Sequence, residues 1–454
     1  MKSLFKNKSY SVYVIFSISV FCIFSFDFFV SWGDLHHPFK NDINQYYSYI
    51  NAIFAEHDLT FKNNLHSYWL IETPIHKVVP KVTYGMAFFY FPFYLFAKLF
   101  SDANSTGYES IYAWAIHFGC ILYIVIGLWV IRKTLLFWFN EMVTSIAILV
   151  LFFGTNLFYY TVSESESVHG ILFFLISAFL YNVVKWHRSR SKINFLFFSS
   201  FAGFICLIRP TECLILLIPL LIGVTSIKDI SVRIIEIIKL KWTLILGVLL
   251  FILPLLPQCI YWKIQSGSFF FFSYGSSEGF FWKDPQVINV LFSYRKGWLV
   301  YSPLMFLSLF GFFLLFKRKK EMFFGILFYF LINLYLISTW WDWAFGGSFG
   351  MRALIHMGPI LIIPLAYTIQ WIIQINKYRC IKIVFHMMLI FFCCLNIFQS
   401  NLYKHGIISY DGMTKEAYWF TFLKKTYSQE DLSYLESIVK HPNYSLMQQG
   451  KRDD

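Results

Sequence analysis

The chain has 454 residues, of which 57% are hydrophobic and 14% are charged, and its formal net charge is +13. Soluble domains carry about 25% charged residues, so this composition excludes an ordinary soluble globular protein. The apolar residues form runs of roughly 18 or more, the length that crosses a hydrocarbon core of about 30 Å. The cationic residues gather in short loops between these runs rather than in a basic and aromatic patch, so nucleic acid is not an expected partner.

These runs predict an all-α polytopic membrane protein whose helices cross the bilayer about eleven times. The apolar run that starts at Tyr10 is too long for a signal peptide, so we expect it to be a retained first helix. The predicted spans are 10–30, 111–131, 141–161, 169–186, 193–208, 211–224, 240–260, 299–316, 322–339, 353–373 and 383–400.

Segment 83–99 is also apolar, and the charges of the loops decide how it is interpreted. Short cytoplasmic loops are enriched in Lys and Arg. If 83–99 does not cross, the basic loops after the later spans, including HRSRSK and KRKK, all face the cytoplasm. If it crosses, they face outward. The sequence therefore predicts that 83–99 is an interfacial or re-entrant helix on the outer side, with the N-terminus in the cytoplasm and the C-terminus outside the plasma membrane.

This topology predicts one membrane domain over 1–400 and a polar tail over 401–454 on the outer side. The outer loops would be 31–110, 261–298 and 340–352. They hold acidic, histidine, glycine and tryptophan residues, whereas the inner loops are plainly basic. Any active site is therefore expected to face outward.

The first outer loop offers carboxylates for acid–base chemistry. Asp42 stands at the start of a predicted helix, where it would serve either as a helix N-cap or as a general base. Asp34 lies beside His36 and His37, but their spacing matches no strong metal motif. No metal or other cofactor is therefore predicted, and metal dependence is left open.

Two further segments have a structural and a functional interpretation. Glu164, Glu166 and His169 lie in a predicted outer loop, either as solvated residues before a helix or as substrate contacts. Arg209 precedes a helix-breaking proline between two apolar runs. It would either extend to the outer interface or bind an anion.

The most informative stretch is WWDWAFGGSFGMR at 340–352, which contains Asp342 and ends at Arg352. Glycines allow close approach of a ligand to the backbone, and a helix start followed by an arginine fork attracts phosphate. The alternative is a structural turn anchored by interfacial tryptophans. Arg295 and Lys296 add two cations in another outer loop, suited to lipid phosphate or an anionic substrate.

Together these features resemble the GT-C superfamily of polytopic glycosyltransferases, which includes protein O-mannosyltransferases and the lipid A aminoarabinose transferase. The resemblance rests on the Asp-x-x-x-Tyr-Tyr-x-Tyr pattern that starts at Asp42, on Arg-Pro-Thr at 209–211, on RKGWLVYSP at 295–303 and on the stretch 340–352. The doubled acidic motif of several families is absent because Ile43 follows Asp42.

The resemblance implies transfer of a sugar from a polyprenyl-phosphate carrier to a glycan, lipid or protein acceptor on the outer face. It implies Asp42 as the catalytic base, with Asp34 as the second candidate. Residues expected to bind the phosphate, the sugar or the acceptor are Arg352, Arg209, Arg295, Lys296, Asp342, Glu164, Glu166 and His169.

Two other functions fit parts of the sequence. A flippase for a lipid-linked glycan, or another transporter, would need polar residues along the bundle interior, whereas the centres of most predicted spans lack charges. A non-catalytic assembly protein would not need an acidic residue and an arginine on the same face.

Overall fold

The computed structural model describes residues 9–25, 39–62, 67, 69–102, 104–275, 278–375 and 379–451. The described chain is mostly helical and carries a small antiparallel sheet. Its contacts divide it into two compact units. The first unit is 1–25, 131–163 and 279–454, and the second is 26–130 and 164–278.

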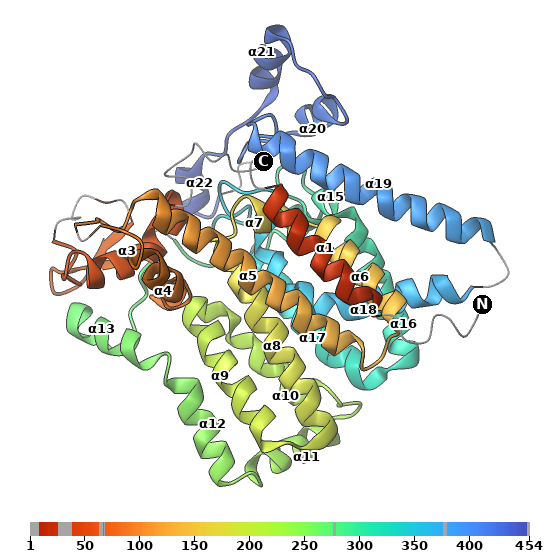
Figure 1. Ribbon diagram of the computed structural model, residues 1–454, viewed down its shortest axis with the longest axis horizontal. Coiled ribbons are helices and arrows are strands. Elements are labelled where there is room, and N and C mark those ends of the chain that lie inside the picture. Colours follow the sequence, from red (N-terminus) through yellow and green to blue (C-terminus); the bar gives the residue numbers. More distant parts are fainter. Residues whose placement is uncertain are drawn as a thin grey trace. The chain divides into compact units, whose positions relative to one another are not determined.

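The first unit is built around α6, which packs against α1, α18 and α19, while α18 packs against α16 (Figure 1). Its helices are α1 (Tyr10–Phe24), the end of α5 (Ser110–Leu135), α6 (Glu141–Phe153), α7 (Tyr159–Val162), α14 (Val287–Phe292), α15 (Trp298–Tyr301), η3 (Pro303–Met305), α16 (Phe306–Arg318), α17 (Lys320–Ser338), η4 (Arg352–Met357), α18 (Gly358–Gln374), α19 (Arg379–Lys404), α20 (Lys415–Thr421), α21 (Gln429–Ile438) and α22 (Tyr444–Gln448).

The second unit has α9 at its centre, packed against α8 and α12, while α3 packs on α4 (Figure 1). Its elements are α3 (Asn41–Phe54), β1 (Leu70–Glu72), β2 (Val78–Pro80), α4 (Gly85–Lys98), most of α5, α8 (Val168–Ser189), α9 (Lys192–Ile208), η2 (Pro210–Leu216), α10 (Leu217–Leu221), α11 (Ile227–Ile238), α12 (Trp242–Ile252) and α13 (Leu256–Ser266). In the sheet, Leu70 pairs with Pro80 and Glu72 with Val78.

The helices support a membrane protein. Among the described residues, five helices are long and apolar enough to cross a bilayer, and the bent pair α12 and α13 would make a sixth span. These are α5, α8, α17, η4 with α18, and α19. Shorter apolar helices lie at four of the other predicted spans, namely α1, α6, α9, and η2 with α10. The all-α membrane fold is thus confirmed, and the count of about eleven spans stays a prediction.

Two of the breaks in the predicted spans lie at prolines. The chain bends by 48° between α12 and α13. Pro254 lies at this bend, and a proline ring removes one backbone donor and clashes with the preceding turn. Likewise α9 ends at Ile208, and Pro210 opens the 3-10 helix η2. The segment predicted as one helix over 141–161 is instead interrupted after Phe153.

Helix α4 corresponds to the ambiguous segment 83–99. It has 14 residues and contains Pro92. At a rise of about 1.5 Å per residue it is roughly 21 Å long, shorter than a hydrocarbon core of about 30 Å. Helix α6, at another predicted span, has 13 residues. The interfacial position of α4 therefore stays a prediction, which labelling would test.

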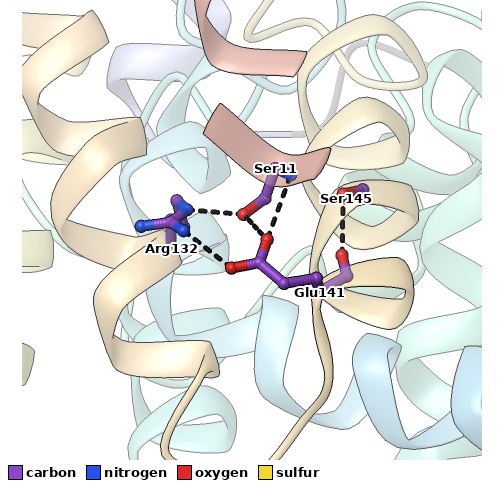
Figure 2. A network of polar contacts seen from close by, with 4 residues as sticks. All are labelled: Ser11, Arg132, Glu141 and Ser145. Atoms are coloured by element: carbon purple, nitrogen blue, oxygen red, sulfur yellow. Dashed lines mark hydrogen bonds and ion pairs between the residues drawn. The ribbon is translucent and has the colours of Figure 1, made fainter. Parts of the chain in front are cut away.

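A polar network ties the start of α6 to α1 and α5 in the first unit. Arg132 donates from Nη2 to the Glu141 carboxylate at 2.7 Å and from Nε to the Ser11 hydroxyl at 2.5 Å. The Ser11 backbone N–H also donates to Glu141, at 3.1 Å (Figure 2). We call these three residues the Arg132 network. It joins three apolar helices through an ion pair whose two charges neutralise each other.

Candidate functional site

The stretch 339–351 of the first unit forms a braced loop between α17 and η4. The Phe281 N–H donates to the Thr339 carbonyl at 2.6 Å, and the Trp341 N–H donates to the Gly279 carbonyl at 2.9 Å. These bonds fasten the loop to the segment that precedes α14. The tryptophan-rich stretch is therefore fixed by its own backbone partners.

Residues after α6 hold the far side of the same loop. The Asn156 side chain donates to the Phe349 carbonyl, and the Phe349 N–H donates to the Tyr160 hydroxyl, both at 3.1 Å. Gly350 follows with φ +57°, and a Cβ there would lie 3.0 Å from Cβ of Tyr301. Only glycine fits this left-handed turn without strain. The turn sets where Arg352 begins η4.

Three cations and two carboxylates gather around this loop. Lys296 is influenced by the charges of Arg295 and Arg352 and by those of Asp342 and Asp411. We call these five residues the loop cluster. Lys296 is 1% exposed, whereas Arg295 and Arg352 are half-buried. The cluster thus brings together four residues that the sequence predicted for one site, namely Arg295, Lys296, Asp342 and Arg352.

The loop cluster changes the acid–base behaviour of its members. Burial, together with the neighbouring Arg352, lowers the pKa of Lys296 to about 7. Its ammonium donates to the backbone carbonyls of Ser348 and Tyr410. Burial raises the pKa of Asp342, although Arg352 and the N–H groups of Gly346 and Ala344 act in the opposite direction. Near neutral pH, therefore, only a fraction of the Lys296 side chains is protonated.

Arg295 lies over an aromatic ring at the edge of the cluster. Its guanidinium is 5.7 Å from the ring centre of Trp343, the range of a cation–π contact. A cluster with more basic than acidic residues, held by backbone and aromatic contacts, is suited to bind phosphate or carboxylate.

The tail beyond α19 supplies residues that the sequence did not single out. Asp411 is 2% exposed and accepts a hydrogen bond from His441 at 2.5 Å and one from Tyr444 at 2.8 Å. The Ser348 N–H donates to the Tyr410 carbonyl at 3.1 Å. No local motif marks these residues, because the pairs lie 30 or more positions apart.

In the second unit, Glu166 is part of a buried pair. Its carboxylate lies 2.5 Å from Nδ1 of His117, and both side chains are 0% exposed. Ser165 donates to the His117 carbonyl at 2.9 Å. His169 is buried and Glu164 half-buried, so the solvated-loop interpretation of this segment is wrong. The loop turns inward, where His117 of α5 meets the Glu166 carboxylate and the Tyr90 hydroxyl donates to the Glu166 carbonyl.

Ser165 and His117 do not form a nucleophile–base pair. The serine and the glutamate both approach Nδ1 of the imidazole, at 3.2 and 2.5 Å. A catalytic triad needs one ring nitrogen for the acid and the other for the nucleophile. We therefore interpret Ser165 as a hydrogen-bonding partner.

Asp42 is exposed in the first turn of α3. The N-cap of this helix is Lys40, so the N-cap interpretation of Asp42 is wrong. Asp34, His36 and His37 lie outside the described residues.

Arg209 lies at the junction of α9 and η2, half-buried and in an extended backbone conformation. The Thr83 hydroxyl donates to the Leu207 carbonyl at 2.5 Å, so the start of α4 lies beside this junction. Arg209 therefore belongs to the second unit, whereas Arg352 and Lys296 belong to the first.

The second unit also contains an apolar cavity of about 290 Å³ between α3, α4 and α13. Aromatic and aliphatic side chains dominate its wall. The lining residues are Tyr49, Ile50, Ile53, Phe54, Leu59, Tyr84, Ala87, Phe88, Phe91, Pro257, Gln258 and Tyr261. A cavity of this size and character suits a hydrocarbon group.

Comparison with known proteins adds no further constraint. No model of a protein family matches this sequence, and no curated protein matches it.

Proposed function

We propose that the chain is a membrane glycosyltransferase that moves a sugar from a polyprenyl-phosphate carrier to an acceptor on the outer face of the membrane. The observation that carries the proposal is the loop cluster, where Arg295, Lys296 and Arg352 converge on one braced loop. Cations preorganised around a developing negative charge are commonly the largest catalytic contribution. The resemblance of the sequence to GT-C enzymes supports the same function.

The chemistry is inverting transfer. The acceptor hydroxyl loses its proton to a base, and its oxygen attacks the anomeric carbon from the side opposite the phosphate. The carbon–oxygen bond to the phosphate breaks, and the carrier leaves as a stable anion that needs no general acid. The resemblance gives Asp42 as the base, with Asp34 as the second candidate in the same loop.

The topology belongs to this proposal, since the site must face outward. The end of α6 that approaches the loop cluster lies opposite the end that holds the Arg132 network. The basic turn Lys317–Lys320 likewise lies at the end of α17 away from the loop. The positive-inside rule places basic turns in the cytoplasm and therefore the loop cluster outside.

Cysteine labelling tests this topology. Cysteines placed at Ser67 and Ser101, on either side of α4, should both react with an impermeant maleimide added outside. A cysteine at Ser101 that reacts only from the cytoplasm would overturn the proposed topology.

A deletion strain tests the function. Without the enzyme, its donor should accumulate as a polyprenyl-phosphate sugar, and the acceptor should lack that sugar. Both are measured by mass spectrometry of extracted lipids and glycans, with the wild-type gene restored as the control. Unchanged lipids and glycans would contradict the proposal.

Proton-coupled transport of a lipid-linked glycan is the second candidate function. The buried His117 and Glu166 pair favours it, because ionisable residues inside a membrane bundle commonly mark a proton or substrate path. The deletion strain separates the two functions. A lost transporter leaves its substrate accessible only from the cytoplasmic face, whereas a lost transferase leaves its donor accessible from outside.

A further inference from the structure

We infer that His441, held by Asp411, is the base that takes the proton from the acceptor hydroxyl. This inference rests on the proposed function and assigns the proton-accepting step to the unit that holds the loop cluster. It concerns the C-terminal tail, which neither the sequence motifs nor the resemblance singled out.

The geometry fixes the tautomer of His441. Nδ1 of the imidazole lies 2.5 Å from Oδ1 of Asp411, whose side chain is 3% exposed. An ionised carboxylate only accepts hydrogen bonds, so Nδ1 carries the hydrogen. The other ring nitrogen, Nε2, then has a lone pair that can accept a proton. The same orientation by a buried carboxylate occurs in catalytic His–Asp pairs.

Several contacts hold the pair in place. The Tyr444 hydroxyl donates to the second oxygen of Asp411 at 2.8 Å. The Lys440 N–H donates to the Gly412 carbonyl at 2.9 Å, which brings the two tail segments together. A Cβ on Gly412 would lie 2.7 Å from the Val439 side chain, so this close approach needs glycine. The imidazole therefore has a fixed position despite lying in a loop.

His441 is open to an acceptor. Its side chain is 57% exposed, and its ring lies 5.6 Å from that of Tyr410 in a tilted stack. The Tyr410 carbonyl accepts the hydrogen bond from Lys296, and the charge of Asp411 acts on the same lysine. Asp411 is itself a member of the loop cluster, so it links His441 to that cluster.

The proton and the electron pairs balance. Nε2 of His441 takes the acceptor proton while the acceptor oxygen forms its bond to the anomeric carbon. The bonding electrons to the phosphate oxygen leave with the carrier. The imidazolium is stabilised by Asp411 and returns the proton to water. Asp411 is a positioning residue in this scheme because it touches His441 and not the acceptor.

The experiment uses the full chain in proteoliposomes, with polyprenyl-phosphate donors that carry radiolabelled hexoses or aminosugars and an envelope lipid extract as acceptor. His441→Ala should lower turnover by about 10²–10⁴, the usual contribution of a general base. Added imidazole should raise the turnover of His441→Ala at least roughly tenfold, because a small base can occupy the space that the exposed side chain leaves. Asp411→Asn should lower kcat more than it raises KM.

Two further variants are compared with His441→Ala. His405 is exposed in the same unit and contacts its own helix at the Asn401 carbonyl, so His405→Ala should keep wild-type turnover with or without imidazole. Asp42→Asn is the competing variant, because the proposed function gives this residue as the base; if His441 takes the proton, the loss of turnover is smaller in Asp42→Asn than in His441→Ala.

The outcomes separate this inference from the proposed function. A wild-type chain that uses none of the donors overturns both. If the wild type is active, full turnover of His441→Ala overturns the role of His441 alone. A loss in His441→Ala that imidazole does not repair also overturns it, because a histidine that only supports the fold leaves no proton transfer to rescue. If Asp42→Asn loses most of its turnover while His441→Ala stays active, Asp42 is the base that takes the acceptor proton.

Discussion

At the start of α6, Arg132 and Glu141 neutralise each other, whereas the loop beyond its other end gathers Arg295, Lys296 and Arg352 against two carboxylates. The first arrangement joins neighbours only nine positions apart. The second draws on segments near 295, 342–352 and 411 and includes a lysine with a lowered pKa. Two opposite charges in contact neutralise each other, while a cluster with more cations than carboxylates is stabilised by binding an anion.

The contrast between the Arg132–Glu141 pair and the loop cluster is tested most strongly at Arg352. Arg352→Ala should lower turnover with a polyprenyl-phosphate donor by about 10²–10³, the usual effect of removing one group that stabilises developing charge. Arg352→Lys keeps the charge but loses the planar fork, so it should recover only part of the activity. Steady-state kinetics of the purified variants measure both.

Arg318→Ala is the matched control, since Arg318 is exposed at the end of α16 in the same unit. It should leave kinetics unchanged. Equal kinetics for Arg352→Ala and wild type would remove Arg352 from the phosphate site.

The turn that places Arg352 gives the second prediction. Gly350→Ala forces a Cβ into a left-handed conformation, 3.0 Å from Cβ of Tyr301. The strain costs about 1–2 kcal/mol and should shift the start of η4, lowering donor use by roughly tenfold. Kinetics and thermal unfolding are measured together.

Gly406→Ala controls for strain alone. Gly406 has φ +74°, with open space where a Cβ would be. It should lower the melting temperature without affecting donor use. If both glycine variants lose stability and neither loses activity, the turn does not position Arg352.

The third prediction concerns pH and Lys296. Its folded pKa of about 7 lies below the ordinary value of 10.5, so the ammonium is charged below this pH and loses its proton above it. Donor affinity should therefore fall as the pH rises through about 7, because the carrier is a phosphodiester whose single charge does not change. Binding of the donor to the protein in nanodiscs measures this profile.

Lys296→Arg sharpens the test. Arginine stays protonated across this range, so the variant should bind the donor with little pH dependence. A wild-type profile that is equally flat would show that the charge of Lys296 does not act on the donor.

The helices were predictable from the sequence because each apolar run carries its own signal. The predicted starts of α8, α9 and α17 lie within two residues of the observed ones. The loop cluster was predicted in part, since Asp342 and Arg352 share one unusual stretch.

The partners of that cluster were not predictable. Asp411 and His441 lie in a polar tail whose local pattern resembles any solvated segment, and only tertiary contacts bring them to Tyr410 and Ser348. The burial of Glu166 was not predictable for the same reason, because its partner His117 lies 49 positions away in an apolar helix.

The smallest expected effect belongs to the Arg132 network. Glu141→Gln keeps the shape of the side chain but removes its charge, so the ion pair becomes a hydrogen bond from the charged Arg132 guanidinium to a neutral amide oxygen. Because the Glu141 side chain is 27% exposed, solvent screens part of the interaction, and the loss should be about 1 kcal/mol. Glu321→Gln is the control, since Glu321 and Lys319 pair at 3.4 Å with both side chains nearly half exposed, and its stability should not change measurably. Thermal unfolding in detergent compares the two, and donor affinity should equal that of the wild type in both. A loss of donor affinity in Glu141→Gln at unchanged stability would mean that this network also contributes to the site, and the contrast between the two ends of α6 would then fail.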